Sequence, residues 1–449
     1  MRIRSGAGRA ARATDAERAG RDALHLLAEG LCAVCRQRDD GARSWLRYFV
    51  NDSNADPGVR ARVRDAVGFC PAHTRHLLGD TSASWLLPSV QGEALAGGLR
   101  LLDDDRARRG PCPACEAGQA AEERALVTVS RALPQAPVRD AVCGGALCLP
   151  HEIALAARSD AAAATAVTTA ATERLTGLAR TGPDDEGPGI GAGVATLAGL
   201  DADAAARGRQ LGRLDPLLDA ERAGAHAPVA DRWAADLRLA CCPLCLAEHR
   251  AARRLLRWAA TSEEGRQAEG TSALCPRHLH DLGGLAGQAA PHAGALVAAN
   301  AEEWRERLAG GSRPKGAPRC RACEEEQLAH ARHAALLAAA LRDPVRARAY
   351  QEAHGVCLRH VLRWDGPPPA PVDTVLRARL ALLGWELAEA RRKQDWRTRH
   401  EVKGAEMTSG SRAPTLLDGR AHAGSPAPGG TARTPDTSTP DAGETGAGG

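Results

Sequence analysis

Two short cysteine motifs alternate along this chain, and their order constrains the fold more than any other feature. A Cys-x-x-Cys pair is followed about thirty residues later by a Cys-x-x-His pair, and this module occurs four times. The gaps between the two pairs hold 34, 32, 29 and 33 residues. The modules use 12 of the 14 cysteines and leave only Cys143 and Cys241. So regular a series predicts a repeated metal-binding unit.

The ligand types indicate zinc. Close Cys and His pairs separated by two residues are typical of structural zinc sites, because the intervening turn directs both donors at one tetrahedral ion. Each module therefore predicts one Cys₃His site, and the whole chain about four zinc ions. The sixteen predicted ligands are Cys32, Cys35, Cys70, His73, Cys112, Cys115, Cys148, His151, Cys242, Cys245, Cys275, His278, Cys320, Cys323, Cys357 and His360. Nearby arginines, such as Arg36, Arg75, Arg277 or Arg359, could offset the net negative charge of such a site.

The order of ligands allows more than one pairing. In a sequential arrangement, the two pairs of one module share an ion. In a crossed arrangement, the two Cys-x-x-Cys pairs of a half share one ion, and the two Cys-x-x-His pairs share the other. We favour the sequential form, because a helical hairpin within each module would bring its own two pairs together. The shorter loop favours it by only roughly 0.7 kcal/mol, so topology carries the argument.

The segments between the motifs read as helical hairpins. Each Cys-x-x-Cys pair is followed by a run rich in Ala, Leu, Arg and Glu, which are good helix formers. Asp-Pro at 56–57 and at 343–344 suits the start of a return helix, with Asp as N-cap and Pro at the first helical position. Gly68 and Gly355 stand where that helix would end. The sequence therefore predicts an all-α fold of tandem zinc-clasped helical hairpins.

The spacing of the modules divides the chain into two repeated halves. Their first cysteines lie at 32, 112, 242 and 320, so the steps are 80, 130 and 78. Helices at 93–109 and 374–393 would join the hairpins. The expected organisation is a flexible N-terminus (1–20), a first half (21–180), a linker region (181–229), a second half (230–402) and a disordered tail (403–449) rich in Gly, Pro, Ser and Thr.

Composition limits the compartment and the partners. No uncharged apolar run of 18 residues occurs, and the basic first residues lack the apolar region of a secretory signal, so we expect a cytoplasmic protein without a membrane partner. Reducing conditions there favour metal binding over disulfides. The net charge of +4 is small against 59 basic and 55 acidic residues. The basic stretch at 389–400 leaves nucleic-acid binding open, but we favour the simpler explanation that basic residues at a helix C-terminus stabilise the helix.

The residues around the cysteine pairs argue against two other roles for them. Haem attachment needs a His directly after Cys-x-x-Cys, and the residues there are Arg36, Glu116, Leu246 and Glu324. A thioredoxin-type motif would follow a β-strand, and no β-rich run precedes these pairs. An iron–sulfur cluster with Cys₃His ligation remains an alternative. We expect Cys143 and Cys241 to be small buried or spare thiols, and His76, His249, His280 and His354 to be surface histidines on helices near the sites.

Two stretches also resemble a bacterial protein family of unknown function. Its members carry a Cys-Pro-x-Cys element and a later Gly-Phe-Cys-x-x-His element followed by a helix, as in "CPLC" (242–245) and "GFCPAHTRHLLG" (68–79). The resemblance covers roughly 22–180 and 230–400. "CAVC" and "CRAC" lack the proline, and only the first module keeps the phenylalanine. The resemblance implies a bacterial, soluble, metal-bound protein and supplies no activity.

The motifs favour a structural role. The chain contains no Gly-rich phosphate loop of the usual type, no His-Glu-x-x-His and no Gly-x-Ser-x-Gly. A site with four protein ligands has no open position for a substrate. We therefore expect a non-catalytic zinc-binding helical scaffold that binds another protein. The alternative is a thiol-based redox or metal sensor, and a weaker one is a nucleic-acid-binding regulator.

Overall fold

The structure is a computed structural model that describes residues 6–28, 32–104, 106–180, 190–201, 237, 241–285, 291–309, 319–398 and 400–419. These residues form helices joined by turns and contain no β-strand, which confirms the all-α prediction. None of the described helices combines the length and the apolar character needed to cross a membrane.

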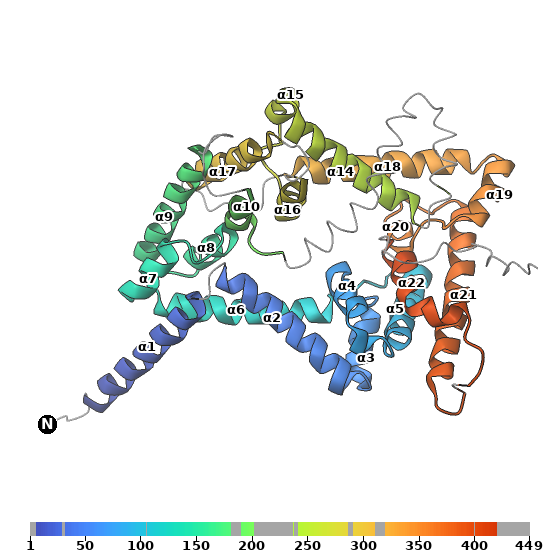
Figure 1. Ribbon diagram of the computed structural model, residues 1–449, viewed down its shortest axis with the longest axis horizontal. Coiled ribbons are helices and arrows are strands. Elements are labelled where there is room, and N and C mark those ends of the chain that lie inside the picture. Colours follow the sequence, from blue (N-terminus) through green and yellow to red (C-terminus); the bar gives the residue numbers. More distant parts are fainter. Residues whose placement is uncertain are drawn as a thin grey trace, which may run out of the picture.

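The first half contains the helices of Figure 1 from blue to green. Their bounds are α1 (Gly6–Leu27), α2 (Ala33–Tyr48), η1 (Phe49–Ser53), α3 (Pro57–Asp65), α4 (Pro71–Gly79), η2 (Thr81–Ala83), α5 (Leu87–Asp103), α6 (Pro113–Ala132), α7 (Ala136–Cys143), α8 (Leu149–Ala156), α9 (Ala161–Arg180) and α10 (Ile190–Ala198).

The second half repeats this series from yellow-green to red. Its described helices are α14 (Pro243–Thr261), α15 (Glu263–Gln267), α16 (Pro276–Leu285), α17 (Ala293–Ala309), α18 (Arg321–Ala340), α19 (Pro344–Glu352), α20 (Leu358–Val361), α21 (Ala370–Gln394), η3 (Ala405–Thr408) and α22 (Ser409–Leu417).

The predicted caps of the return helices are present. Asp56 accepts hydrogen bonds from the backbone N–H groups of Gly58 and Val59 at 2.7 and 3.0 Å, and Asp343 caps α19 by accepting one from Val345 at 2.8 Å. Gly68 and Gly355 follow α3 and α19 with φ of 81° and 80°, a left-handed conformation that favours glycine. Local sequence rules therefore fix both ends of these short helices.

In each half, the two helices that begin at the Cys-x-x-Cys pairs lie side by side and run antiparallel. These are α2 with α6, and α14 with α18 (Figure 1). In the first half, small residues permit a close approach: a Cβ atom on Gly41 would lie 2.6 Å from the Cβ of Ala121, and one on Gly118 would lie 2.8 Å from the carbonyl oxygen of Arg38. The antiparallel pair places one Cys-x-x-Cys pair near each end.

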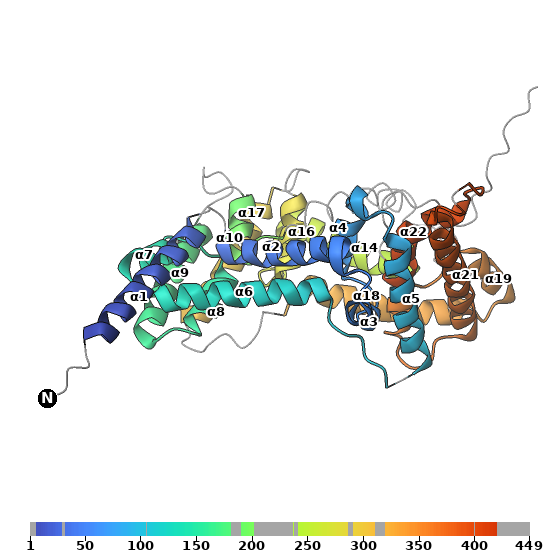
Figure 2. The ribbon, with the colours of Figure 1, turned by 90° about the horizontal axis from the view of Figure 1, so that it is seen from below.

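The halves are joined by two copies of one arrangement. Helix α5 of the first half packs against α21 and α22 of the second, while α17 of the second half packs against α9 and α10 of the first (Figures 1 and 2). Helices α5 and α17 occupy the same place in the repeat, as do α9 and α21, and α10 and α22. The contacts between the halves are therefore approximately two-fold symmetric.

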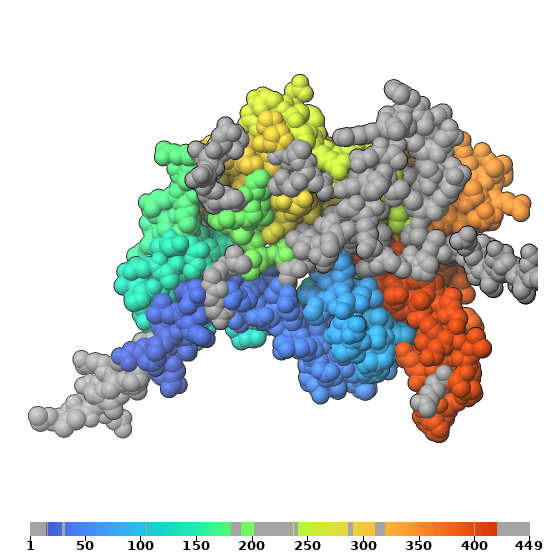
Figure 3. Space-filling model, in the orientation of Figure 1, coloured from blue at the N-terminus to red at the C-terminus, as the bar shows by residue number. Residues whose placement is uncertain are grey.

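Two hydrophobic cores contain residues from both halves. One includes Leu95 and Leu383, and the other includes Leu175 and Leu296. In the space-filling view, the blue surface of the first half meets the red surface of the second, and the green surface meets the yellow (Figure 3). The repeat explains why there are two such cores. The first half supplies α5 to one core and α9 and α10 to the other, and the second half supplies the matching helices α17, α21 and α22.

Three helical segments lie outside the expected halves. Helix α1 begins inside the expected flexible N-terminus 1–20, and α10 lies inside the expected linker 181–229. The expected disordered tail begins at 403, but η3 and α22 continue the second half to residue 419, so that expectation is wrong for residues 403–419. The physical reason is that α22 buries the apolar side chains of Ala413, Leu416 and Leu417. The rest of the tail and most of the linker lie outside the described residues.

Candidate metal centres

Each predicted ligand pair begins a helix. Cysteine is the N-cap residue of α2, α4, α6, α8, α14, α18 and α20, and Cys275 directly precedes α16. Proline at the first helical position, as at Pro71 and Pro113, sets the backbone for the helix without losing a needed hydrogen bond. The second donor of each pair lies one turn further on. The helix dipole at these positions favours the thiolate form of cysteine.

All sixteen predicted ligands gather in four groups of three Cys and one His. Site 1 is Cys32, Cys35, Cys148 and His151; site 2 is Cys70, His73, Cys112 and Cys115; site 3 is Cys242, Cys245, Cys357 and His360; and site 4 is Cys275, His278, Cys320 and Cys323. The number of sites and the composition of each agree with the sequence analysis. Sites 1 and 3 are equivalent by the repeat, as are sites 2 and 4.

The pairing within each half is nested, so both pairings drawn from the sequence are wrong. The first Cys-x-x-Cys pair of a half joins the last Cys-x-x-His pair, and the inner two pairs join each other. Thus Cys35 Sγ lies 3.7 Å from Cys148 Sγ, and Cys115 Sγ lies 3.6 Å from Cys70 Sγ. The hairpin does not bring its own two pairs together.

Helix length explains the nested pairing. The outgoing helix of the first module runs through α2 and η1, from Ala33 to Ser53, which at 1.5 Å per residue is about 31 Å. The return helix α3 has only 9 residues and spans about 14 Å. The Cys-x-x-His pair therefore stops far short of the start of α2. It meets the start of α6 instead, because α6 runs antiparallel to α2.

The four sites have nearly the same dimensions. At site 1, Nδ1 of His151 lies 3.1–3.4 Å from the three sulfurs, and at site 2, Nδ1 of His73 lies 3.2–3.6 Å from them. The corresponding distances are 3.3–3.4 Å at site 3 and 3.2–3.5 Å at site 4. The recorded sulfur–sulfur distances are 3.6–3.9 Å.

These dimensions fit a single tetrahedral ion. With metal–sulfur bonds near 2.3 Å and metal–nitrogen bonds near 2.0 Å, tetrahedral geometry separates two sulfurs by about 3.8 Å and a sulfur from a nitrogen by about 3.5 Å. A polynuclear iron–sulfur cluster spreads its ligands over several irons, so four donors in mutual contact suit it less well. Each group could therefore hold one ion with a complete set of four protein donors.

Three of the four histidines are oriented by a carboxylate on the side away from the sulfurs. Nε2 of His151 lies 3.1 Å from Glu122, Nε2 of His360 lies 3.1 Å from Glu248, and Nε2 of His278 lies 3.6 Å from Glu326. Such a partner fixes the ring and leaves Nδ1 as the ligand atom. Among the described residues, His73 has no carboxylate within ion-pair distance.

These glutamates were not among the residues predicted from the sequence, although the repeat marks two of them. Glu248 and Glu326 each lie three residues after the second cysteine of their pair, so they occupy the same helical position in α14 and α18. The first half has no Glu there and supplies Glu122 from the middle of α6 instead. An arginine positioned to offset the negative charge, as predicted, is present at site 3, where Nη2 of Arg359 lies 3.5 Å from Cys245 Sγ.

One thiol at each site has a pKa far below its ordinary value. These thiols are Cys32, Cys112, Cys242 and Cys320, the first cysteine of every Cys-x-x-Cys pair. At site 2, hydrogen bonds from Cys115 and Cys70 lower the pKa of Cys112 to about 3. At site 3, burial opposes the ionisation of Cys242, but the neighbouring thiols outweigh it. Each cluster thus favours one thiolate, while contact with that thiolate raises the pKa of a second thiol, which a metal ion would have to deprotonate.

Sites 1 and 3 are covered by the backbone of a glycine. A Cβ atom on Gly199 would lie 2.7 Å from Cys35 Sγ, and one on Gly419 would lie 2.5 Å from Cys245 Sγ. Both glycines have positive φ, 77° and 76°. Leu200, the residue after Gly199, donates its backbone N–H to Cys35 Sγ at 3.4 Å. These glycines follow α10 and α22, so the covering segment belongs to the repeat, and it too was missed from the sequence.

The four sites differ in burial. All four ligands are buried at site 1, and all but Cys245 at site 3. At site 4, Cys275 and Cys323 are half-buried, while all four ligands are half-buried at site 2. Site 2 thus combines the most accessible thiols with a histidine that has no carboxylate contact within the described part of the chain.

The remaining candidate residues stay outside the four groups. Cys143 is half-buried, and burial raises the pKa of its thiol, while Cys241 is buried. His76, His249, His280 and His354 are not among the clustered donors. The expectation of a surface helix histidine is wrong for His354, which is buried and lies just after the end of α19. His330 stacks on His360 with ring centres 5.0 Å apart and lies near Glu248, but Arg359 and Arg363 already pair with that carboxylate.

Comparisons of the chain with family models, with curated proteins and with solved structures gave no match. The resemblance noted from the sequence therefore stays an expectation.

Proposed function

We propose that the protein is a non-catalytic zinc-binding scaffold whose helical surfaces bind another protein. The observation that carries the proposal is the complete set of four donors at every site, three Cys and one His at tetrahedral spacing. Structural zinc sites have this closed composition, whereas catalytic sites keep a position for water or substrate. The thiols must stay reduced to bind metal, which suits the cytoplasm.

The arrangement of the sites supports a structural role for the ions. Each ion would link residues at least 39 positions apart, and at site 1 it would link Cys32 to His151 across almost the whole first half. A metal that closes long loops stabilises the folded state against the unfolded chain. Removal of the ions should therefore loosen each half.

The test is metal analysis of the purified protein, combined with thermal unfolding. The proposal predicts about four zinc ions per chain and a large fall in melting temperature after chelation. Substitution of both Cys242 and Cys245 by Ser should remove one ion and leave three. A native protein with at most one ion, which takes up no more on reconstitution, would contradict the zinc assignment. A full complement together with turnover of a substrate would contradict the non-catalytic role.

Site 2 supports the second candidate, a thiol-based redox or metal sensor. Its ligands Cys70, Cys112 and Cys115 are half-buried, so an oxidant could reach them more easily than the buried ligands of site 1. Mild peroxide treatment separates the two candidates. A sensor releases zinc from site 2 and regains it after reduction, with a change in the binding of its target. A scaffold keeps its partner throughout.

A further inference from the structure

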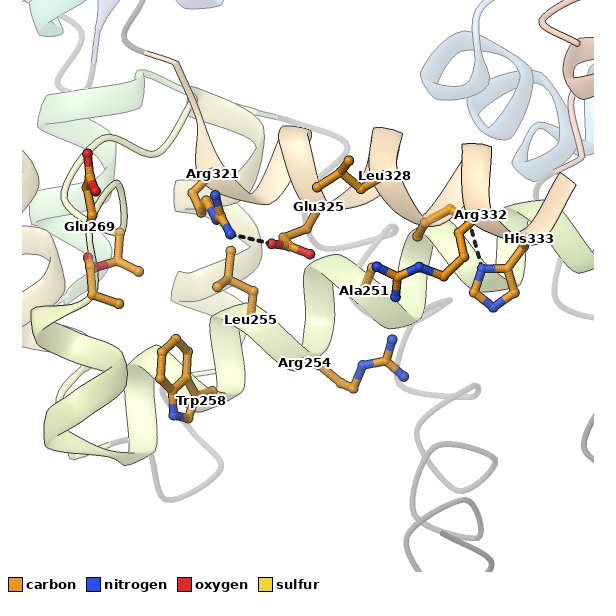
Figure 4. A pocket seen from close by; sticks show the side chains of 13 residues that line it. Ala251, Arg254, Leu255, Trp258, Glu269, Arg321, Glu325, Leu328, Arg332 and His333 are labelled. Carbon is orange, nitrogen blue, oxygen red and sulfur yellow. Dashed lines mark hydrogen bonds and ion pairs between the residues drawn. The ribbon is translucent and has the colours of Figure 1, made fainter. Parts of the chain in front are cut away.

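A cavity of about 540 Å³ lies along the groove between α14 and α18 (Figure 4). Its apolar part is formed by Leu255 and Trp258 from α14 and by Leu328 from α18. Trp258 and Leu328 leave 44% and 52% of their surface exposed, although both are large apolar side chains. Exposed apolar groups gathered in a groove mark interaction sites more often than isolated ones do.

Two arginines face each other at one end of this groove. Arg254 extends from α14 and Arg332 from α18, beside His333 (Figure 4). Neither forms an ion pair within the described residues, whereas Arg321 in the same groove pairs with Glu325 at 2.8 Å. Two unpaired guanidinium groups from facing helices form a ready site for carboxylates, which they can bind with two hydrogen bonds each.

The charges favour an acidic peptide over a nucleic acid. Glu269 lies at the other end of the groove, beyond Trp258, and Glu325 lines its middle (Figure 4). A phosphate backbone is negative along its whole length and would be repelled by Glu269, whereas Glu325 is already paired with Arg321. A peptide can place its carboxylates near Arg254 and Arg332 only and leave apolar side chains for the rest.

The exposed face extends beyond the cavity along α18. Leu328, Arg332 and Leu336 are spaced by four residues, so they lie on one face of the helix, and Leu336 is 40% exposed. From Leu328 to Leu336 the face is about 12 Å long, or two helical turns. An amphipathic helix would cover this length, with apolar groups three or four residues apart.

In the first half, closer packing narrows the corresponding space between α2 and α6, for a reason visible in the repeat. There Gly41 packs directly against Ala121, which closes the space between α2 and α6. By the offset that relates Cys32 to Cys242, Gly41 corresponds to Ala251. By the offset that relates Cys112 to Cys320, Gly118 corresponds to Glu326. The larger residues prevent the same close approach of α14 and α18, and the groove remains open.

We propose that the groove between α14 and α18 binds an acidic amphipathic segment of a partner protein. Carboxylates of the segment pair with Arg254 and Arg332, and its apolar side chains contact Trp258, Leu328 and Leu336. This inference rests on the proposed scaffold function and assigns that function to one surface.

The test uses the full-length zinc-loaded protein and a displayed library of random 12-residue peptides. Selected peptides should combine Asp or Glu with Leu, Phe or Trp. Fluorescence anisotropy with the labelled peptides should show at least tenfold weaker binding by Arg254→Glu/Arg332→Glu. Peptides with Lys in place of their acidic residues should bind this variant better than they bind the native protein. Circular dichroism and zinc content confirm that the variant is folded.

The matched control changes the corresponding positions of the first half. Ser44 and Arg124 lie where Arg254 and Arg332 lie in the second, so Ser44→Glu/Arg124→Glu should bind the selected peptides within twofold of the native protein. Selected peptides without acidic residues, or equal binding to both double variants, would overturn the proposal. So would binding of a labelled DNA duplex that depends on Arg254.

A cross-linking experiment distinguishes failure of the groove from failure of the scaffold function. If a native partner cross-links equally to the native protein and to Arg254→Glu/Arg332→Glu, the scaffold function stands and the groove assignment falls. If neither form cross-links to any protein and the library yields no binder, both proposals fail.

Discussion

At the scale of single residues, the glycines that cover sites 1 and 3 are as hard to replace as the Cys and His residues of those sites. Gly199 lies against the sulfurs of Cys35 and Cys148 in a left-handed conformation, and Gly419 has the same relation to site 3. No other residue type combines that backbone with so close an approach to sulfur. The approach also allows the backbone N–H of Leu200 to donate a hydrogen bond to Cys35 Sγ.

Gly199→Val should disrupt site 1. The positive φ alone costs about 1–2 kcal/mol for a non-glycine residue, and the new Cβ must displace Cys35 Sγ. We expect a lower melting temperature and weaker zinc binding by one of the four sites, measured by calorimetry and chelator competition. Gly191→Ala is the control, because Gly191 has open space around it and a helical conformation. Equal zinc affinity of both variants would show that the close approach has no role.

His354 makes the docking of α22 depend on pH. Burial is the main reason that its pKa falls to about 4, and its contact with the backbone of Thr415 in α22 opposes this only partly. The neutral ring is therefore favoured in the folded protein. Because the unfolded pKa is about 6.5, the stability that His354 confers is complete above that pH and is lost as the pH falls towards 4.

Between pH 7.5 and pH 5, this residue should lower the free energy of unfolding by about 2 kcal/mol. His354→Asn cannot take up the proton, so the variant should lose correspondingly less stability over the same interval. Urea unfolding at the two pH values measures the difference, with zinc content checked at pH 5. An equal loss in both proteins would mean that His354 is not buried as a neutral group.

At the scale of helices, α22 is an essential part of the second half. It follows α21 as α10 follows α9, and it packs against α5 of the first half. Removal of residues 403–449 should therefore destabilise the protein. The loss of burial of Leu416 and Leu417 alone corresponds to roughly 3–6 kcal/mol.

A chain that ends at Gly419 is the matched control, because it keeps η3 and α22. Thermal unfolding of the two truncated proteins isolates the contribution of these elements, and we expect the shorter one to melt many degrees lower. Site 3 should also lose affinity for zinc in the shorter chain, since Gly419 covers it. Identical melting temperatures would contradict the docked position of α22.

The sequence predicted the local features and missed the long-range ones. Ligand pairs, the N-cap Asp56 and the terminal Gly68 follow rules that act within a few residues, and the structure contains each of them. The pairing of the sites depends on the lengths of α2 and α3, and the sequence does not mark where α2 and η1 end. The docking of α22 depends on a surface provided by α5, more than 300 residues earlier in the chain.

At the scale of the whole molecule, the four sites should differ in stability. Site 2 has the most exposed ligands, and its His73 has no carboxylate contact among the described residues, whereas such a contact typically contributes 10- to 100-fold in metal affinity. A graded chelator titration should therefore remove the ion of site 2 first. Pulsed alkylation at the loss of one ion should label Cys70, Cys112 and Cys115. Earlier labelling of Cys32 and Cys35 would contradict this order.

The nested pairing links the beginning of each half to its end. Each half is closed by an outer site that joins its first and last ligand pairs. The halves then contact each other through α5 of the first half and α17 of the second, each of which packs in a core shared with the other half. A sequential pairing would give four independent hairpins instead. The two pairings make different predictions about which thiols lose their ion together.

Alkylation of a site 1 variant distinguishes them directly. In zinc-loaded Cys148→Ser/His151→Ala, brief labelling followed by peptide mass spectrometry should modify Cys32 and Cys35, because these two lose half of their site. The cysteines of site 2 should stay protected. The reciprocal variant, Cys32→Ser/Cys35→Ser, should expose Cys148 and no cysteine of site 2.

Each other pairing predicts a different labelled residue in Cys148→Ser/His151→Ala. If Cys112 and Cys115 react while the first pair stays protected, the sequential pairing is correct. If Cys70 reacts instead, the crossed pairing is correct. Either result would contradict the nested arrangement, and labelling confined to Cys32 and Cys35 is the result that the structure predicts.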